Sequence, residues 1–122
     1  MAVPVANYAH AVHVSDATQW VFTSGVVPTR GDGTVPSAIG EQADVVWGNI
    51  RTLLADAGLQ MDDIVSVTTY VVATSDLADR LPEVMAARDR ALGGHRAAST
   101  LVTVPALAQP AWQMEIAVIA AK

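Results

Sequence analysis

The chain of 122 residues contains no cysteine, and its only lysine is Lys122 at the last position. Without cysteine there is no thiolate nucleophile, disulfide or thiolate metal site, and the redox compartment stays undetermined. A single terminal lysine argues against Schiff-base chemistry. The other basic residues are all arginines: Arg30, Arg51, Arg80, Arg88, Arg90 and Arg96.

Charge is also scarce, because only 16% of the residues are charged while 52% are apolar. A monomer with so little charge would expose apolar patches, so the composition predicts a homo-oligomer that buries them. The net charge is −5, and no basic stripe is present. This balance argues against nucleic acid as a partner.

Long hydrophobic runs are missing too, and none reaches the length of a transmembrane helix. Residues Met1–Tyr8 lack the basic and apolar regions of a signal peptide. We therefore expect a cytoplasmic protein with no membrane partner. At this length we expect residues 1–122 to form a single domain.

Hydrophobic periodicity and turn residues predict the element order ββαβαββ. Such an order is typical of an α+β layer in which two helices cover one face of a mixed sheet, and a partner subunit would cover the other face. The predicted strands are Ala9–Val14, Gln19–Thr23, Ile64–Val72, Ser99–Val104 and Trp112–Ala120, the first two joined as a hairpin.

Turn and cap residues bound the two predicted helices. Ser37 is expected to cap a helix that runs to about Ala57, with Gly58 as its C′ residue. Ser75 or Asp76 is expected to cap the second helix, which Gly93-Gly94 closes. Pro82 marks either a kink or the first turn of a helix that starts later. We interpret Arg30-Gly31-Asp32 as a turn rather than an adhesion tripeptide.

Glu115 is the only charge in the apolar run Trp112–Ala120. A strand period of two places it on one face with Ala117 and Ile119, so we expect it to point into an enclosed space. A carboxylate in such surroundings must be hydrogen-bonded, paired or protonated, and such groups cluster at functional sites. The alternative is an edge-strand glutamate that reaches solvent past its neighbours.

Other candidate chemistry is weak. His10 and His13 are an odd number of residues apart and would face opposite sides of a strand, while His95 lies among glycines, so we expect no metal site. Ser24 and Ser99 lack an evident His–Asp partnership. We expect no cofactor, and Glu115 remains the strongest candidate.

Several short motifs nevertheless follow one another in a specific order. They are Tyr8; Phe22-Thr-Ser-Gly25 with Pro28; Gly33-Thr-Val-Pro36; Gln42 with Asn49-Ile50; Ala57-Gly58; Asp63-Ile64-Val65; Ser99–Val104 with Leu107; and Met114–Ala120. Together and at this spacing, they make the chain resemble the Rid (reactive intermediate deaminase, RidA/YjgF) family over nearly its whole length. The resemblance implies a homotrimer of chorismate-mutase-like α+β subunits with three pockets between neighbours. Archetypal members hydrolyse reactive enamines and imines, such as 2-aminoacrylate, to 2-keto acids and ammonia.

The resemblance also implies roles for individual residues. Glu115 occupies the position of the family's catalytic carboxylate, which orients a water and moves protons, and Tyr8 matches the pocket tyrosine. The backbone N–H groups of Gly25 and Leu101 match donors to the bound acid, and we place Ser24 with them in the substrate-binding group.

One departure from the family pattern concerns the substrate's carboxylate. Archetypal enzymes clamp it with an arginine, and this chain has Ser99 at that position. Arg96 lies an odd three residues upstream, so it could substitute only from a flexible loop. Arg88 in the second helix is either a pocket wall or a salt-bridge residue.

Loss of the arginine removes a contact worth about 1.5–3 kcal/mol, which is roughly ten- to hundredfold in affinity. We therefore expect a Rid-type enzyme for a less acidic or larger imine or enamine, with Ser99 and Thr100 as neutral hydrogen-bonding groups. The alternative is a non-catalytic trimer that binds a small metabolite or a partner protein. Ribonuclease activity, also attached to this family, is disfavoured by the negative net charge.

Overall fold

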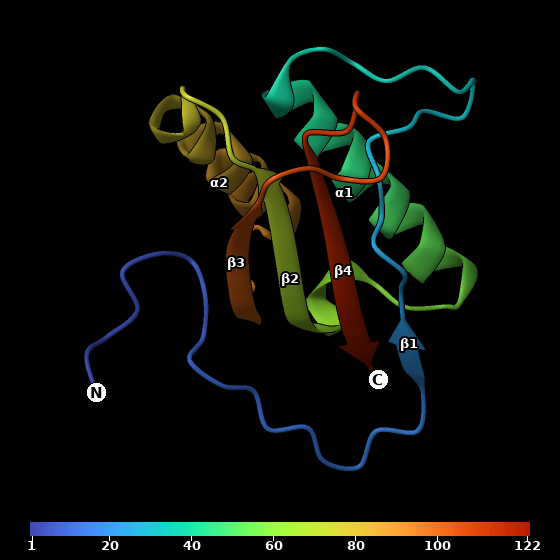
Figure 1. Cartoon of the computed structure of the whole chain (residues 1–122). Coiled ribbons are helices and arrows are strands. Elements are labelled where there is room, and N and C mark those ends of the chain that lie inside the picture. The colour runs from blue at the N-terminus through green and yellow to red at the C-terminus, as the bar shows by residue number, and fades with distance from the viewer.

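The computed structural model describes all residues from 1 to 122. Four strands form one sheet in the order β1-β4-β2-β3 (Figure 1). β2 and β3 run parallel, whereas β4 is antiparallel to both β1 and β2, so the predicted mixed sheet is confirmed. The elements are β1 (Trp20–Phe22), α1 (Ile39–Asp56), the 3₁₀ turn η1 (Met61–Asp63), β2 (Ile64–Val72), α2 (Leu77–Leu92), β3 (Ala98–Val104) and β4 (Met114–Ala121).

The core lies between the two helices and one face of the sheet. Along β4 every second side chain, beginning at Met114, is buried, and those between are half-buried. α1 contributes a continuous buried stripe, as its spacing predicts. This confirms the α+β layer with helices on one side only. The buried residues of α1 are Ile39, Gln42, Ala43, Val46, Trp47, Ile50 and Leu54.

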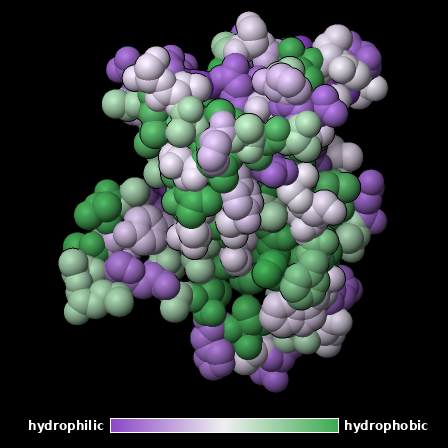
Figure 2. Space-filling view, in the orientation of Figure 1, coloured by the Kyte–Doolittle hydropathy of each residue, from purple (hydrophilic) through white to green (hydrophobic).

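The opposite face of the sheet carries no helix. Trp20 and Phe22 of β1 stack there with ring centroids 6.2 Å apart, and their side chains are 48% and 69% exposed. In the space-filling view, green and pale residues cover most of the middle, and purple ones gather mainly toward the upper and lower rims (Figure 2). Neither helix is both long and apolar enough to span a membrane.

Glycines end both helices where the sequence predicts. Gly58 has φ +81° and Gly93 has φ +59°, a region that side-chain-bearing residues rarely adopt. The expected serine cap of the first helix is wrong, because Ala38 is the N-cap and no side chain bonds the free N–H groups. Asp76 occupies the N-cap position of α2, but its side chain does not bond the free N–H groups of the helix. Its carboxylate instead accepts a hydrogen bond from the Thr74 hydroxyl (2.6 Å). That bond lowers the pKa of Asp76 below its ordinary value.

Pro82 lies inside α2, which starts at Leu77. The interpretation in which the helix starts later, with Pro82 in its first turn, is therefore wrong. The turn before it is supported by the Asp76 carbonyl, which accepts from the N–H groups of Asp79 (3.0 Å) and Arg80 (3.2 Å).

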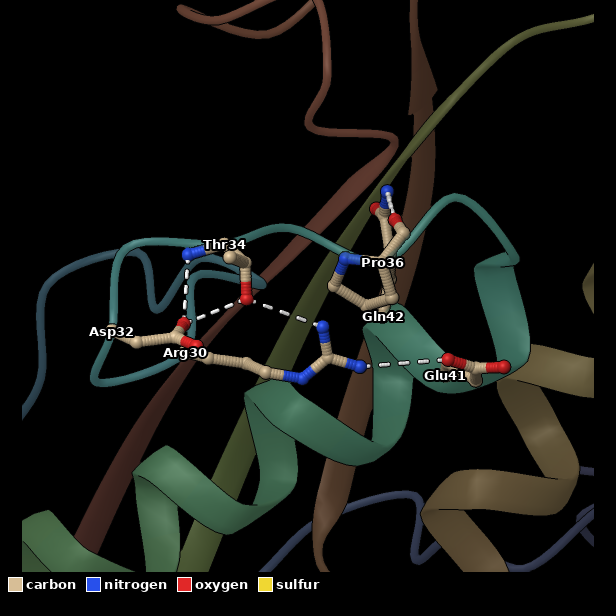
Figure 3. A network of polar contacts seen from close by, with 6 residues as sticks. All are labelled: Arg30, Asp32, Thr34, Pro36, Glu41 and Gln42. Carbon is tan, nitrogen blue, oxygen red and sulfur yellow. Dashed lines mark hydrogen bonds and ion pairs between the residues drawn. The ribbon is translucent and has the colours of Figure 1, made fainter.

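Gln42 is fully buried and joins three segments of the chain. Its Nε2 donates to the carbonyls of Pro36 (2.8 Å) and Ala111 (2.9 Å), and its Oε1 accepts from the N–H of Gln113 (2.9 Å). Figure 3 shows the bond to Pro36 at the start of α1. One amide thus holds the loop before α1 against the loop that leads into β4.

The Arg30-Gly31-Asp32 tripeptide forms a turn, as predicted. The hydroxyl and N–H of Thr34 donate to the Asp32 carboxylate (2.7 and 3.0 Å) and hold the pKa of Asp32 below its ordinary value. Arg30 donates to the Thr34 hydroxyl (3.3 Å) and pairs with Glu41 of α1 (3.5 Å; Figure 3). Both charged side chains of the tripeptide are therefore engaged within the chain.

The predicted N-terminal hairpin is wrong. Residues 9–14 form no strand, and the only pairing there is a bridge between Ala9 and Ala98 at the start of β3. The chain then passes below the sheet from the β3 side to β1 (Figure 1). There the N–H groups of Thr18 and Gln19 donate to the carbonyl of Lys122 (3.0 Å each). The second predicted strand, Gln19–Thr23, therefore begins beside the end of β4. Long-range partners compete successfully with the local hairpin.

Candidate functional site

A β-bulge interrupts the ladder between β1 and β4. Phe22 pairs with Ile119, and Val26 pairs with Ile116. The three residues between Phe22 and Val26 therefore lie opposite only two residues of β4. The extra residue lies within Thr23-Ser24-Gly25. Such bulges are enriched beside active sites, where they redirect the backbone.

Hydrogen bonds hold the bulge from both ends. The Thr23 N–H donates to the Val118 carbonyl (3.1 Å), and the Thr23 hydroxyl accepts from the Val118 N–H (3.0 Å). Val26 and Ile116 exchange a backbone pair of 2.7 and 3.1 Å. Between these anchors Gly25 is directed at the side chain of Glu115.

Gly25 and Glu115 approach so closely that a side chain at position 25 would displace the Glu115 carboxylate. A Cβ added to Gly25 would overlap the Glu115 carboxylate, lying 2.8 Å from its Cδ. The absence of a side chain at this position therefore leaves room for the carboxylate. It allows the Glu115 carboxylate to lie against the backbone of the bulge.

Glu115 lies on the sheet face that the helices leave uncovered. It is half-buried, opposite Tyr70 in the register, and no ion pair of the chain includes it. β4 lies between β1 and β2, so Glu115 is not on an edge strand, although it is only half-buried on this uncovered face. The enclosed space that we expect around Glu115 is not formed by this chain alone.

A groove of about 570 Å³ runs beside the bulge, between it and α1. Gly25 lines this groove and also contacts Glu115. Phe22 (69% exposed) and Leu53 (45% exposed) make part of the groove wall apolar.

Asn49 supports the groove, and sequence reasoning assigned it no positioning role. Its Nδ2 donates to the carbonyls of Val27 (3.3 Å) and Thr29 (3.0 Å), which fixes the segment after Gly25. Thr23 was missed as well. The sequence signal for Thr23 was a polar residue next to Ser24-Gly25. The signal for Asn49 was an amide on the otherwise apolar side of a helix.

The other expected substrate-binding residues lie on β3. In the register with β2, Thr100 faces the same side as Glu115, whereas Ser99 and Leu101 face the helices. β1 and β3 are opposite edges of the sheet. Three strand spacings separate them, roughly 14 Å. A single chain therefore does not bring the bulge together with Ser99, Thr100 and Leu101.

Tyr8 and Arg96 also lie near the β3 edge. The N–H of Ala9, next to Tyr8, donates to the carbonyl of Ala97, next to Arg96 (2.9 Å). Arg96 is exposed and precedes β3 by two residues. The parallel register places the start of β3 level with Ser66, whereas Glu115 is level with Tyr70. Arg96 is thus far from Glu115 along the strands of its own chain.

Arg88 is buried on α2, on the helix side of the sheet. Its Nε and Nη2 donate to Asp89 (3.3 and 3.2 Å). Within one chain it therefore makes a salt bridge and lies across the sheet from Glu115.

Comparison with known proteins shows the family and supports the fold. The family model described as Endoribonuclease L-PSP matches residues 1–122. A solved structure of the conserved Rid protein YyfB from Yersinia pestis superposes with a TM-score of 0.83 at 27% identity, covering 95% of this chain and 87% of that one. The chain belongs to the Rid family. Escherichia coli TdcF, solved with bound serine, superposes on this Rid protein with a TM-score of 0.74 at 27% identity, covering 96% of this chain and 93% of the other.

A curated relative of this Rid protein carries an activity in its name. The 2-iminobutanoate/2-iminopropanoate deaminase of Escherichia coli K12 is 33% identical over 64 residues, which is 52% of this chain and 50% of that protein. The chain thus spans about half the length of this curated relative.

Proposed function

We propose that residues 1–122 form one Rid-type catalytic domain that hydrolyses a reactive imine or enamine to a carbonyl compound and ammonia. The observation that carries this proposal is the Glu115 carboxylate, which lies unpaired against Gly25 of a β-bulge. The name of the related deaminase supports the same reaction class.

Glu115 acts as the acid–base residue in this proposal. An enamine first tautomerises to its imine. The carboxylate then takes a proton from a water as the water oxygen attacks the C=N carbon, and the resulting carboxylic acid delivers that proton to the nitrogen, which gives the neutral carbinolamine. Collapse of the carbinolamine forms the C=O bond and releases ammonia, so one water is consumed for each ammonia formed.

The complete pocket forms between neighbouring subunits in this proposal. The bulge with Glu115 lies at the β1 edge, and Ser99, Thr100 and Leu101 lie on β3, the opposite edge strand. A neighbour that places its β3 edge beside the groove would unite the two sets. The uncovered apolar face around Trp20 and Phe22 would be buried in the same homotrimer.

The preferred substrate carries less negative charge than a 2-imino acid. Ser99 offers a neutral hydroxyl where archetypal enzymes have a guanidinium, and Arg88 is held by Asp89. Imines and enamines that lack a carboxylate, or that are larger, suit such a site.

The direct test is release of ammonia from freshly generated imines. Purified protein would be assayed with 2-aminoacrylate and with bulkier or uncharged imines, and we expect faster turnover of the latter. A ligand that raises the melting temperature, with no turnover of any imine, would instead establish the alternative of a non-catalytic binding trimer.

Gly25→Ala tests the contact between the bulge and the carboxylate. The added methyl group must displace Glu115, so we expect kcat to fall about 10–100-fold while the fold is retained. Gly48→Ala is the matched control, because no atom lies within 4 Å of its added Cβ. Equal activity of both variants would contradict the proposed placement of Glu115.

Ser99→Arg tests the substrate class. Restoring a bidentate cation should raise kcat/KM for 2-iminopropanoate about 10–100-fold and leave an uncharged imine unaffected. Steady-state ammonia release with both substrates measures the change. An equal effect on both substrates would show that position 99 does not contact the carboxylate.

A further inference from the structure

Tyr70 of β2 lies directly opposite Glu115 in the sheet. The register pairs Tyr70 with Glu115 of β4 and with Val102 of β3, so all three side chains lie on the face that the helices leave uncovered. Directly opposite residues of antiparallel strands have Cβ atoms about 4.5–5.5 Å apart, whereas diagonal neighbours are about 7–8 Å apart. Tyr70 is therefore the hydroxyl-bearing residue that the sheet places nearest to Glu115.

The carboxylate and the phenol lie on different sides of β4, which runs between β1 and β2 (Figure 1). The Glu115 carboxylate is held against Gly25 on the β1 side, and Tyr70 lies on the β2 side. Ala117 follows Glu115 on the same face of β4, and its methyl group is too small to fill the space above the strand. A small substrate over β4 would thus have the carboxylate on one side and the phenol on the other.

The Tyr70 hydroxyl has no hydrogen-bond partner within the chain. Tyr70 is half-buried, and the only buried side-chain donor or acceptor left without a partner is the Trp47 indole nitrogen, so the phenol oxygen is reachable from the uncovered face. Its neighbours on that face, Val72 and Val102, are apolar. Buried tyrosine hydroxyls usually find a partner. Once a neighbouring subunit covers this face, the hydroxyl requires a partner that the chain itself does not supply.

We propose that Tyr70 is a second catalytic residue, whose hydroxyl donates a hydrogen bond to the nitrogen of the imine. This inference rests on the imine hydrolysis proposed above. The in-plane lone pair of the nitrogen accepts from Tyr70, which polarises the C=N bond. As the water oxygen bonds to the carbon, the π electron pair moves onto the nitrogen, and a donor aimed at that atom stabilises the charge that develops there. Tyr70 keeps its proton, because Glu115 carries the proton of the water to the π electron pair.

Tyr70→Phe removes only the hydroxyl and keeps the ring. We expect kcat to fall about 10–100-fold while KM changes less than about twofold, because the hydrogen bond strengthens as charge develops on the nitrogen. The melting temperature should be retained. Thr68→Val is the matched control, since it removes a hydroxyl from the same face of β2 at a position opposite Ala117. Ammonia release from the best imine substrate and thermal melting measure both variants.

Wild-type kcat in Tyr70→Phe, an equal loss of kcat in Thr68→Val, or a change confined to KM would overturn the role of Tyr70. Glu115→Gln separates this failure from failure of the hydrolysis itself. Loss of activity in Glu115→Gln with full activity in Tyr70→Phe would overturn only the inference about Tyr70. Absence of imine turnover in the unaltered protein would overturn both proposals.

Discussion

Glu115→Gln is expected to lower kcat for imine hydrolysis by about 10²–10⁴-fold, the usual contribution of general acid–base catalysis. Glutamine keeps the shape of the side chain and can still contact the Gly25 backbone. It cannot accept a proton from the attacking water. Ammonia release measured on the best imine substrate, at saturating concentration, gives the effect on kcat.

Folding should be retained in Glu115→Gln, since Glu115 makes no ion pair within the chain. Glu41→Gln is the control for general loss of negative charge. Glu41 is exposed and pairs only with the exposed Arg30, an interaction worth about 0–1 kcal/mol. Full activity in Glu41→Gln with loss in Glu115→Gln supports the mechanism, and unchanged turnover in Glu115→Gln would eliminate it.

Gln42→Leu is expected to destabilise the protein by about 2–4 kcal/mol. Leucine has nearly the same volume and fits the buried position, but it leaves the Gln113 N–H and the Pro36 carbonyl without the partners that Gln42 provides. Each buried unsatisfied group costs about 1–3 kcal/mol, and the more exposed Ala111 carbonyl can turn to water. Urea unfolding monitored by circular dichroism measures the change.

The matched control for Gln42→Leu is Gln109→Leu. Gln109 lies in the loop before β4, which Gln42 contacts through the Ala111 carbonyl. Its side chain is exposed, and only its backbone carbonyl accepts a hydrogen bond, from the N–H of Trp112. Its replacement should change stability by less than about 0.5 kcal/mol. Similar losses in the two variants would show that the buried hydrogen bonds of Gln42 contribute little.

Regular periodicity made much of the fold predictable. The run Ile64–Val72 is rich in β-branched residues, and its predicted bounds match β2. Gly58 and Gly93 mark the helix ends because their positive φ angles favour glycine. The period of two in the last strand correctly separated Glu115 from the buried Met114 and Ile116.

Local reasoning failed where distant segments compete. The Ala9–Val14 segment could pair with Gln19–Thr23, yet Ala9 meets β3 and Gln19 meets Lys122. Ser37 is a good cap by type, but Ala38 is the N-cap and no side chain caps the helix. For the N-terminal segment the actual partners are far away in sequence, so a local pattern cannot reveal them.

By itself, the sequence determined the family, the α+β layers and the face on which Glu115 lies, because these depend on motif order and on the repeat of side chains along each element. Only the tertiary structure decided that Gly25 touches Glu115 and that β1 and β3 form opposite edges of the sheet. It alone left the buried Trp47 indole N–H without a hydrogen-bond acceptor in the chain. Such relations depend on how strands are ordered and how closely helices pack, and residues distant in sequence set both.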